Sequence, residues 1–82
     1  MRKYDPLMSY LESQHDQIML LRFEAIESII GQKLPRSAYQ HRAWWSNETE
    51  VTHVQARSWL DSGWRVASVD ISQELVQFAR CQ

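Results

Sequence analysis

The chain has 82 residues, of which 44% are hydrophobic and 23% charged, and nine basic against ten acidic residues leave a formal net charge of −1. This length predicts a single domain over residues 1–82, and the composition is that of a globular protein rather than a disordered one. The near-neutral charge by itself indicates neither a nucleic-acid nor a membrane partner.

The residue inventory also argues against several kinds of chemistry. Cys81 is the only cysteine, so an internal disulfide or a cysteine zinc cluster is excluded. The sequence offers no metal-ligand spacing of histidines, no glycine-rich phosphate loop and no nucleophile beside a base. We expect no signal peptide, because no apolar region follows the basic residues near the start. The longest apolar run, residues 18–21, is far shorter than a membrane span of ~20 residues. We therefore expect a cytoplasmic protein without enzymatic activity, metal, cofactor or membrane partner.

The first half of the chain predicts a helix, a strand and a second helix. Asp5 and Pro6 are typical of a helix start, with Asp5 as N-cap, and the helix should cover about residues 5–13. The short apolar run at 17–22 favours a strand. A helical stripe of apolar residues follows over 23–30, and Gly31 is a natural stop.

Residues 32–50 form a long connection in which one short helical turn could begin at Ser37. Long connections in small domains are often functional. After it, Thr52 and Gln55 fit a capping box, so a third helix should begin at Thr52 and end at Gly63.

The last part of the chain predicts a β-hairpin. Residues 64–71 and 75–80 are rich in strand-forming side chains, and a shift in the apolar phase indicates a bulge near Ala67. The element order is then helix-strand-helix-helix-strand-strand, an α+β class with a small antiparallel sheet. That order is typical of a winged helix, whose second helix of the helix-turn-helix pair enters the DNA major groove.

The connection is also the strongest candidate for a binding site. The stretch from Ser28 to Asn47 contains no acidic residue but mixes cations with aromatic residues, a combination that suits nucleic acid. Of the adjacent Trp44 and Trp45, one should lie in the core and the other at the surface. We expect the nucleic-acid-binding residues to be Arg36, Tyr39, Arg42, Trp45, Ser46, Asn47, His53, Gln55 and Arg57. Each of these features also has a structural alternative. The cations then belong to a solvated loop, both tryptophans anchor that loop in the core, and the third helix is an ordinary amphipathic surface helix.

Several short motifs resemble a small bacterial and phage domain family of unknown function. They are Phe23-x-x-Ile26-Glu27-x-Ile29-Ile30-Gly31, Leu34-Pro35-x-Ser37-Ala38, Arg42-x-Trp44-Trp45-x-Asn47 and Gln55-Ala56-x-x-Trp59-Leu60-x-x-Gly63-Trp64-x-Val66. The resemblance implies that residues 34–47 are a signature of the domain, and it implies no activity.

Two functions remain open from the sequence. The first is a small nucleic-acid-binding protein, with DNA as the main target, that acts as a regulator or accessory of a mobile element or a defence system. The second is a protein-interaction module, such as a phage-borne inhibitor or adaptor, that uses the Trp-rich connection. A homodimer is compatible with either function.

Overall fold

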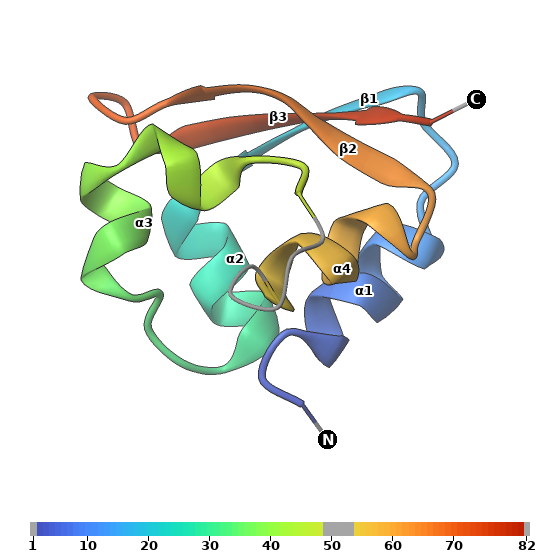
Figure 1. The fold of residues 1–82 in the computed structure, drawn as a ribbon. Helices are drawn as coiled ribbons and strands as arrows, with labels where there is room; N and C mark the ends of the chain where they lie inside the picture. The colour runs from blue at the N-terminus through green and yellow to red at the C-terminus, as the bar shows by residue number, and fades with distance from the viewer. Residues whose placement is uncertain (1, 49–53, 82) are drawn as a thin grey trace.

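A three-stranded antiparallel sheet forms one layer of the molecule, and the helices form the other (Figure 1). The computed structural model describes residues 2–48 and 54–81. The strands are β1 (Ile18–Arg22), β2 (Trp64–Asp70) and β3 (Leu75–Arg80), in the order β1-β3-β2. The helices are α1 (Asp5–Glu12), α2 (Phe23–Ile30), α3 (Arg36–Gln40) and α4 (Val54–Leu60), together with the 3₁₀ helix η1 (Arg42–Trp45).

The α+β class and the predicted winged-helix-like order are confirmed, with β2 and β3 forming the closing hairpin. The predicted start of the first helix needs one correction. Its N-cap is Tyr4, which makes no side-chain cap bond, and Asp5 lies in the first turn. The Asp5 carboxylate instead accepts a hydrogen bond from the backbone N–H of Arg2 at 3.0 Å. The predicted capping box begins at Thr52, which lies outside the described residues.

The stretch between α2 and α4 is more regular than the long loop that we expected. The short turn predicted from Ser37 is the helix α3, which begins at Arg36, and the two tryptophans end the 3₁₀ helix η1. Two short helices, α3 and η1, therefore lie between α2 and α4 in the described part of this stretch, where a simple helix-turn-helix has a tight turn.

Two glycines allow the chain to leave its helices. Gly31 directly follows α2 with φ 75°, and Gly63 lies between α4 and β2 with φ 90°. Side chains with a Cβ rarely adopt these angles, so both positions favour glycine. The Gly63 turn leads directly to the fully buried Trp64, as the sequence predicted.

The predicted bulge in β2 is also confirmed. The pairing register with β3 shifts between Val66 and Ser68, so Ala67 is the additional residue. A bulge of one residue reverses the side-chain alternation beyond it. As a result Trp64, Val66 and Val69 all face the helices.

The core lies between the sheet and the helices and is built mainly from aromatic rings. Trp45 stacks between Phe23, with ring centroids 4.8 Å apart, and Trp59, at 6.0 Å. The largest fully buried side chains are Trp45, Trp59, Trp64, Phe23, Phe78, Leu7, Leu11, Ile26 and Val76. Such rings give a short chain enough buried apolar area to fold.

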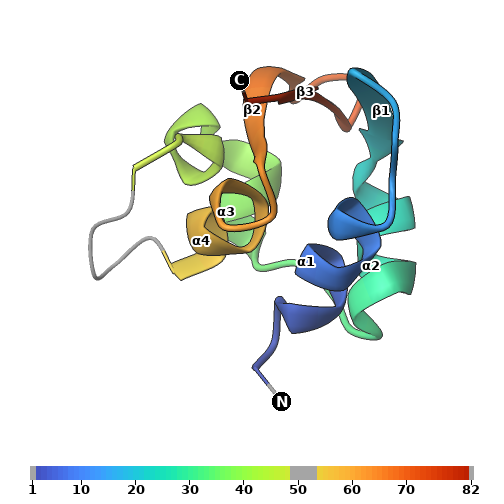
Figure 2. The ribbon, with the colours of Figure 1, turned by 90° about the vertical axis from the view of Figure 1, so that its right-hand side faces the viewer.

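The other face of the sheet carries no helix in the described part of the chain (Figure 2). On β1, Ile18 and Leu20 are exposed on that face, whereas Met19 and Leu21 face the core. The sheet therefore has one apolar face buried by the helices and one open face.

Candidate functional site

Trp45 is a core residue and not the surface contact predicted for it. Only 2% of its surface is exposed. Its indole Nε1 donates a hydrogen bond to the carbonyl oxygen of Ala38 at 2.9 Å. The two tryptophans differ in burial, as expected, but Trp44 is half-buried and packs on the core. The sequence alone did not show which of the two tryptophans is buried, because they lie in the 3₁₀ helix η1 and not in an extended segment.

Asn47 joins three segments through its side-chain amide, although the residue itself is exposed. Its Oδ1 accepts hydrogen bonds from Trp59 Nε1 at 3.0 Å and from the backbone N–H of Val66 at 2.8 Å. Its Nδ2 donates to the Val66 carbonyl at 2.9 Å. The Asn47 side chain therefore fastens the end of the connection to α4 and β2.

Gln55, expected to read bases from the first turn of the third helix, is buried. It is 4% exposed, and its Nε2 donates to the carbonyl of Trp44 at 2.9 Å. Ser58, one turn further along the same helix, is buried as well. The connection thus covers the flank of α4 that carries Gln55.

Tyr39 and Arg42 also hold the connection in place. The Tyr39 hydroxyl donates to Glu27 Oε2 at 2.8 Å, and burial together with this carboxylate raises the pKa of Tyr39 to about 12. Glu27 accepts a second hydrogen bond from the backbone N–H of Leu34 at 2.9 Å. Arg42 donates from a guanidinium nitrogen to the carbonyl of Val69 at 2.7 Å.

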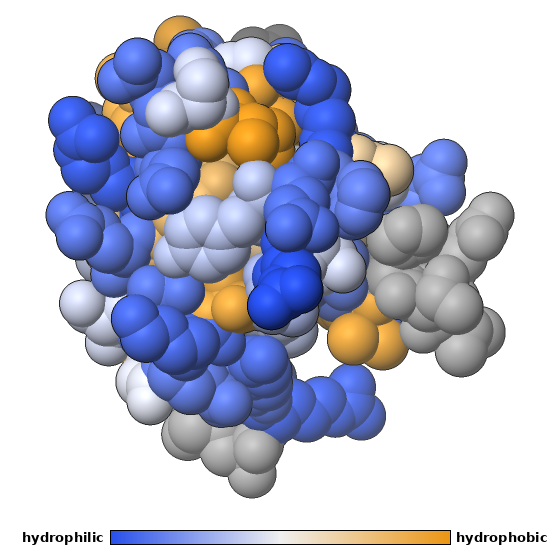
Figure 3. Space-filling view, turned by 90° about the vertical axis from the view of Figure 1, so that its left-hand side faces the viewer, coloured by the Kyte–Doolittle hydropathy of each residue, from blue (hydrophilic) through white to orange (hydrophobic). Residues whose placement is uncertain are grey.

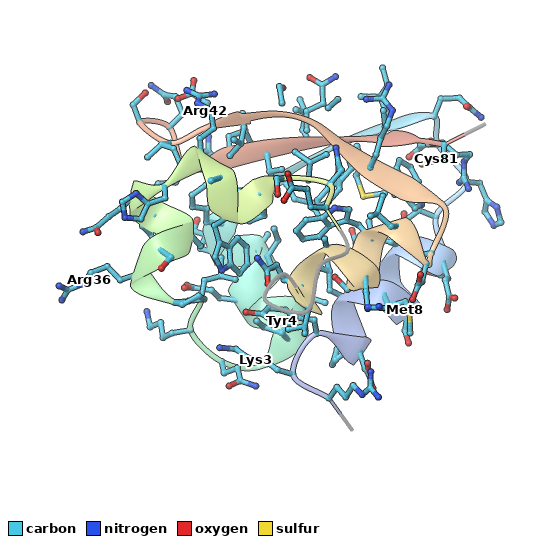
Figure 4. All side chains as sticks on the ribbon, viewed as in Figure 1. Lys3, Tyr4, Met8, Arg36, Arg42 and Cys81 are labelled. Carbon is cyan, nitrogen blue, oxygen red and sulfur yellow. The ribbon has the colours of Figure 1, made fainter. Side chains whose placement is uncertain are left out.

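The two arginines of the connection, Arg36 and Arg42, lie apart from each other (Figure 4). Arg36 and Arg57 are exposed, Ser46 is half-buried, and His53 lies outside the described residues. Arg36 points outward from α3, whereas Arg42 lies at the sheet end of the molecule (Figure 4). The face that carries α3 is largely hydrophilic, with only small apolar patches (Figure 3). The cations of the acid-free stretch therefore do not converge around an exposed aromatic ring.

A groove of about 600 Å³ lies between the N-terminal end of α1 and α4. Apolar and aromatic side chains, Tyr4, Met8 and Val54, line part of it. The polar residues that line it are Arg2, Lys3, Arg57, Asp5, Asp61 and Ser58. Of these only Arg57 was among the residues expected from the sequence.

The groove combines three cations with a half-buried aromatic ring. Lys3 Nζ lies 5.5 Å from the centroid of the Tyr4 ring, and that ring packs edge-on against Trp44 at 6.0 Å. Burial raises the pKa of Tyr4, so its hydroxyl stays protonated at neutral pH. The groove can therefore offer positive charge, a hydroxyl and a flat apolar surface to a ligand.

The described residues show no arrangement suited to metal chemistry. Among residues 2–48 and 54–81, no three His, Cys, Asp or Glu side chains come together as possible metal ligands. Within the same ranges, no helix is both long and apolar enough to cross a membrane.

The comparisons with known proteins identify a family for the chain, and they assign no function to it. A family model described as a domain of unknown function (DUF7662) matches residues 4–81. This agrees with the expected resemblance to a small domain of unknown function. No curated protein and no solved structure gave a significant match.

Proposed function

We propose that this chain, which belongs to the DUF7662 family, is a small nucleic-acid-binding protein that acts as a regulator or accessory factor, with duplex DNA as its first target. One observation carries the proposal. In the winged-helix-like order, α4 takes the place of the helix that enters the major groove, and its exposed Arg57 lines one groove with Arg2 and Lys3.

The chemistry of the groove suits contacts to phosphate and sugar more than base reading. Guanidinium and ammonium groups bind phosphate oxygens directly, and the Tyr4 ring provides a surface for a sugar or base. Asp5 and Asp61 on the same groove oppose a polyanion, so binding should be weak. Three phosphate contacts predict a slope of about −2.7 in a plot of log affinity against log salt.

The test is a fluorescence-anisotropy titration of labelled duplex DNA, single-stranded DNA and RNA at low and rising salt. Arg57→Ala should weaken binding and reduce the salt slope by about one, and the double variant Arg2→Ala/Lys3→Ala should reduce it by about two. The matched control is Arg65→Ala, which removes an exposed cation on the open face of the sheet.

Two results would overturn the proposal. One is the absence of binding to all three nucleic acids at high protein concentration. The other is an equal loss in Arg65→Ala and Arg57→Ala, because a general effect of net charge would then explain the binding.

The second candidate function is a protein-interaction module, and the composition of the groove favours it. Met8 and the exposed Val54 line the groove beside charges of both signs, such as Arg57 and Asp61. A peptide with an apolar anchor and mixed charges would fit this surface without strong salt dependence. Peptides selected from a display library should then bind the wild-type chain and fail to bind Val54→Asp. A selection that yields no such peptide would exclude this candidate.

A further inference from the structure

Strand β1 lies at the edge of the sheet and exposes two large apolar side chains. Ile18 is 58% exposed and Leu20 is 59% exposed. Their neighbours on β3 are Ala79 and Gln77, which are too small or too polar to cover them. An edge strand with exposed apolar side chains is a template for pairing with another chain, and proteins usually protect it.

The backbone of β1 is oriented for such pairing. At one end of β1, Arg80 donates its N–H to the carbonyl of Gln17 at 2.9 Å, and at the other end Phe23 donates its N–H to the carbonyl of Glu74, just before β3, at 2.8 Å. The odd-numbered residues of this stretch therefore direct their backbone groups toward β3. In an antiparallel ladder the even-numbered ones, Ile18 and Leu20, then direct their N–H and C=O groups to the open edge.

We propose that β1 forms a homodimer interface by pairing antiparallel with β1 of a second copy, in a register centred on Met19. Ile18 of one copy then lies opposite Leu20 of the other, and each such pair exchanges backbone N–H···O bonds. The two sheets become one continuous sheet, and the four exposed apolar side chains cover one another on its open face.

Charge complementarity selects this register and this partner. The strand sequence is Asp16-Gln17-Ile18-Met19-Leu20-Leu21-Arg22, so a two-fold axis at Met19 places Asp16 of each copy opposite Arg22 of the other. Both side chains are exposed and oppositely charged. A register centred on Leu20 would instead place Arg22 opposite Ile18. A two-fold symmetric interface must be complementary to itself. The stretch 16–22 meets this requirement in the register centred on Met19.

The first test is the mass of the full chain in solution, measured by sedimentation equilibrium over a range of concentrations. The wild type should approach twice the 9.8 kDa mass of one chain as concentration rises. Leu20→Lys should remain folded by circular dichroism, because the side chain is exposed, and should have the mass of one chain. A wild type that stays monomeric at every concentration overturns the proposal.

The sharper test is a charge exchange across the two-fold axis. Arg22→Asp and Asp16→Arg should each produce monomers, because each places like charges opposite one another. The double variant Asp16→Arg/Arg22→Asp should restore the dimer. Arg22 is the N-cap of α2, where Asp is well tolerated, so the single variant should keep its fold. Arg65→Asp is the matched control and should leave the mass unchanged. Failure of the double variant to restore dimerisation overturns the proposed register.

Amide hydrogen exchange provides a measurement that needs no variant. The N–H groups of Ile18 and Leu20 should be protected at high concentration and should exchange faster on dilution. Those of Met19 and Leu21, which point toward β3, should be protected under both conditions. Equal and concentration-independent exchange at all four positions contradicts the proposal.

Discussion

The connection between α2 and α4 and the groove between α1 and α4 use similar residue types in opposite ways. In the connection, Tyr39, Arg42 and Asn47 all donate hydrogen bonds to groups of other segments. In the groove, Arg57 projects from a regular helix and remains exposed. The comparison shows what polar side chains in an irregular segment are often needed for. They form hydrogen bonds with backbone N–H and C=O groups that have no partner within a helix or a strand pair.

The largest expected effect is on the stability of the connection. Trp45→Ala should lower the free energy of unfolding by ~3–5 kcal/mol, because it leaves a cavity between Phe23 and Trp59. Urea denaturation measures the loss. Trp44→Ala is the control and should cost clearly less, because Trp44 is only half-buried. Equal losses would show that both rings contribute alike to the core.

The next effect tests whether Asn47 is structural. Asn47→Ala removes the partner of Trp59 Nε1 and of both backbone groups of Val66, and should cost about 2 kcal/mol of stability. Asn47→Asp keeps the accepting oxygen and should cost less. If Asn47→Ala has wild-type stability in urea but no longer binds nucleic acid, the residue belongs to a binding site after all.

A smaller effect concerns the pH dependence of stability. Partial burial raises the pKa of Glu27, but the hydrogen bonds from Leu34 and Tyr39 and the charge of Lys33 outweigh it and lower the pKa below 4.5. The stabilisation is therefore present above pH 4.5 and is lost as pH falls through the lowered value. Thermal melts from neutral pH to below pH 4 should show this loss, and Glu27→Gln should reduce it. Glu24→Gln, at an exposed position of the same helix, should leave it unchanged.

The smallest effect is expected at Arg36, which is exposed on α3. Its substitution is compared with that of Arg42, the other arginine of the connection. Arg36→Ala should change stability by no more than ~0.5 kcal/mol, as is usual for surface positions. Arg42→Ala should cost about 1 kcal/mol, because it removes the hydrogen bond to Val69. Similar values for both variants would remove the distinction between a free and a structural cation.

The elements were predictable because their signals are local. The apolar period over 23–30, the stop at Gly31 and the phase shift near Ala67 each depend on neighbouring residues, and each agrees with the structure. The extent of α3 and η1 was not predictable to the same degree, because short helices carry few periodic positions.

The candidate site was less predictable because its geometry depends on contacts between distant segments. Whether Trp45 or Trp44 is buried depends on Phe23 and Trp59. Likewise, the groove exists because α1 and α4 pack together and bring Lys3 near Arg57, which lie more than fifty positions apart in the printed sequence.

The position of β3 between β1 and β2 also determines when the protein can fold during its synthesis. Both of the other strands pair only with β3, and β3 is the last of the described elements to leave the ribosome. Until then β1 and β2 have no partner within the sheet, and the apolar residues that face the core stay uncovered. The helices alone cannot bury them, so the domain should fold in one late step, after the segment 75–80 has been made.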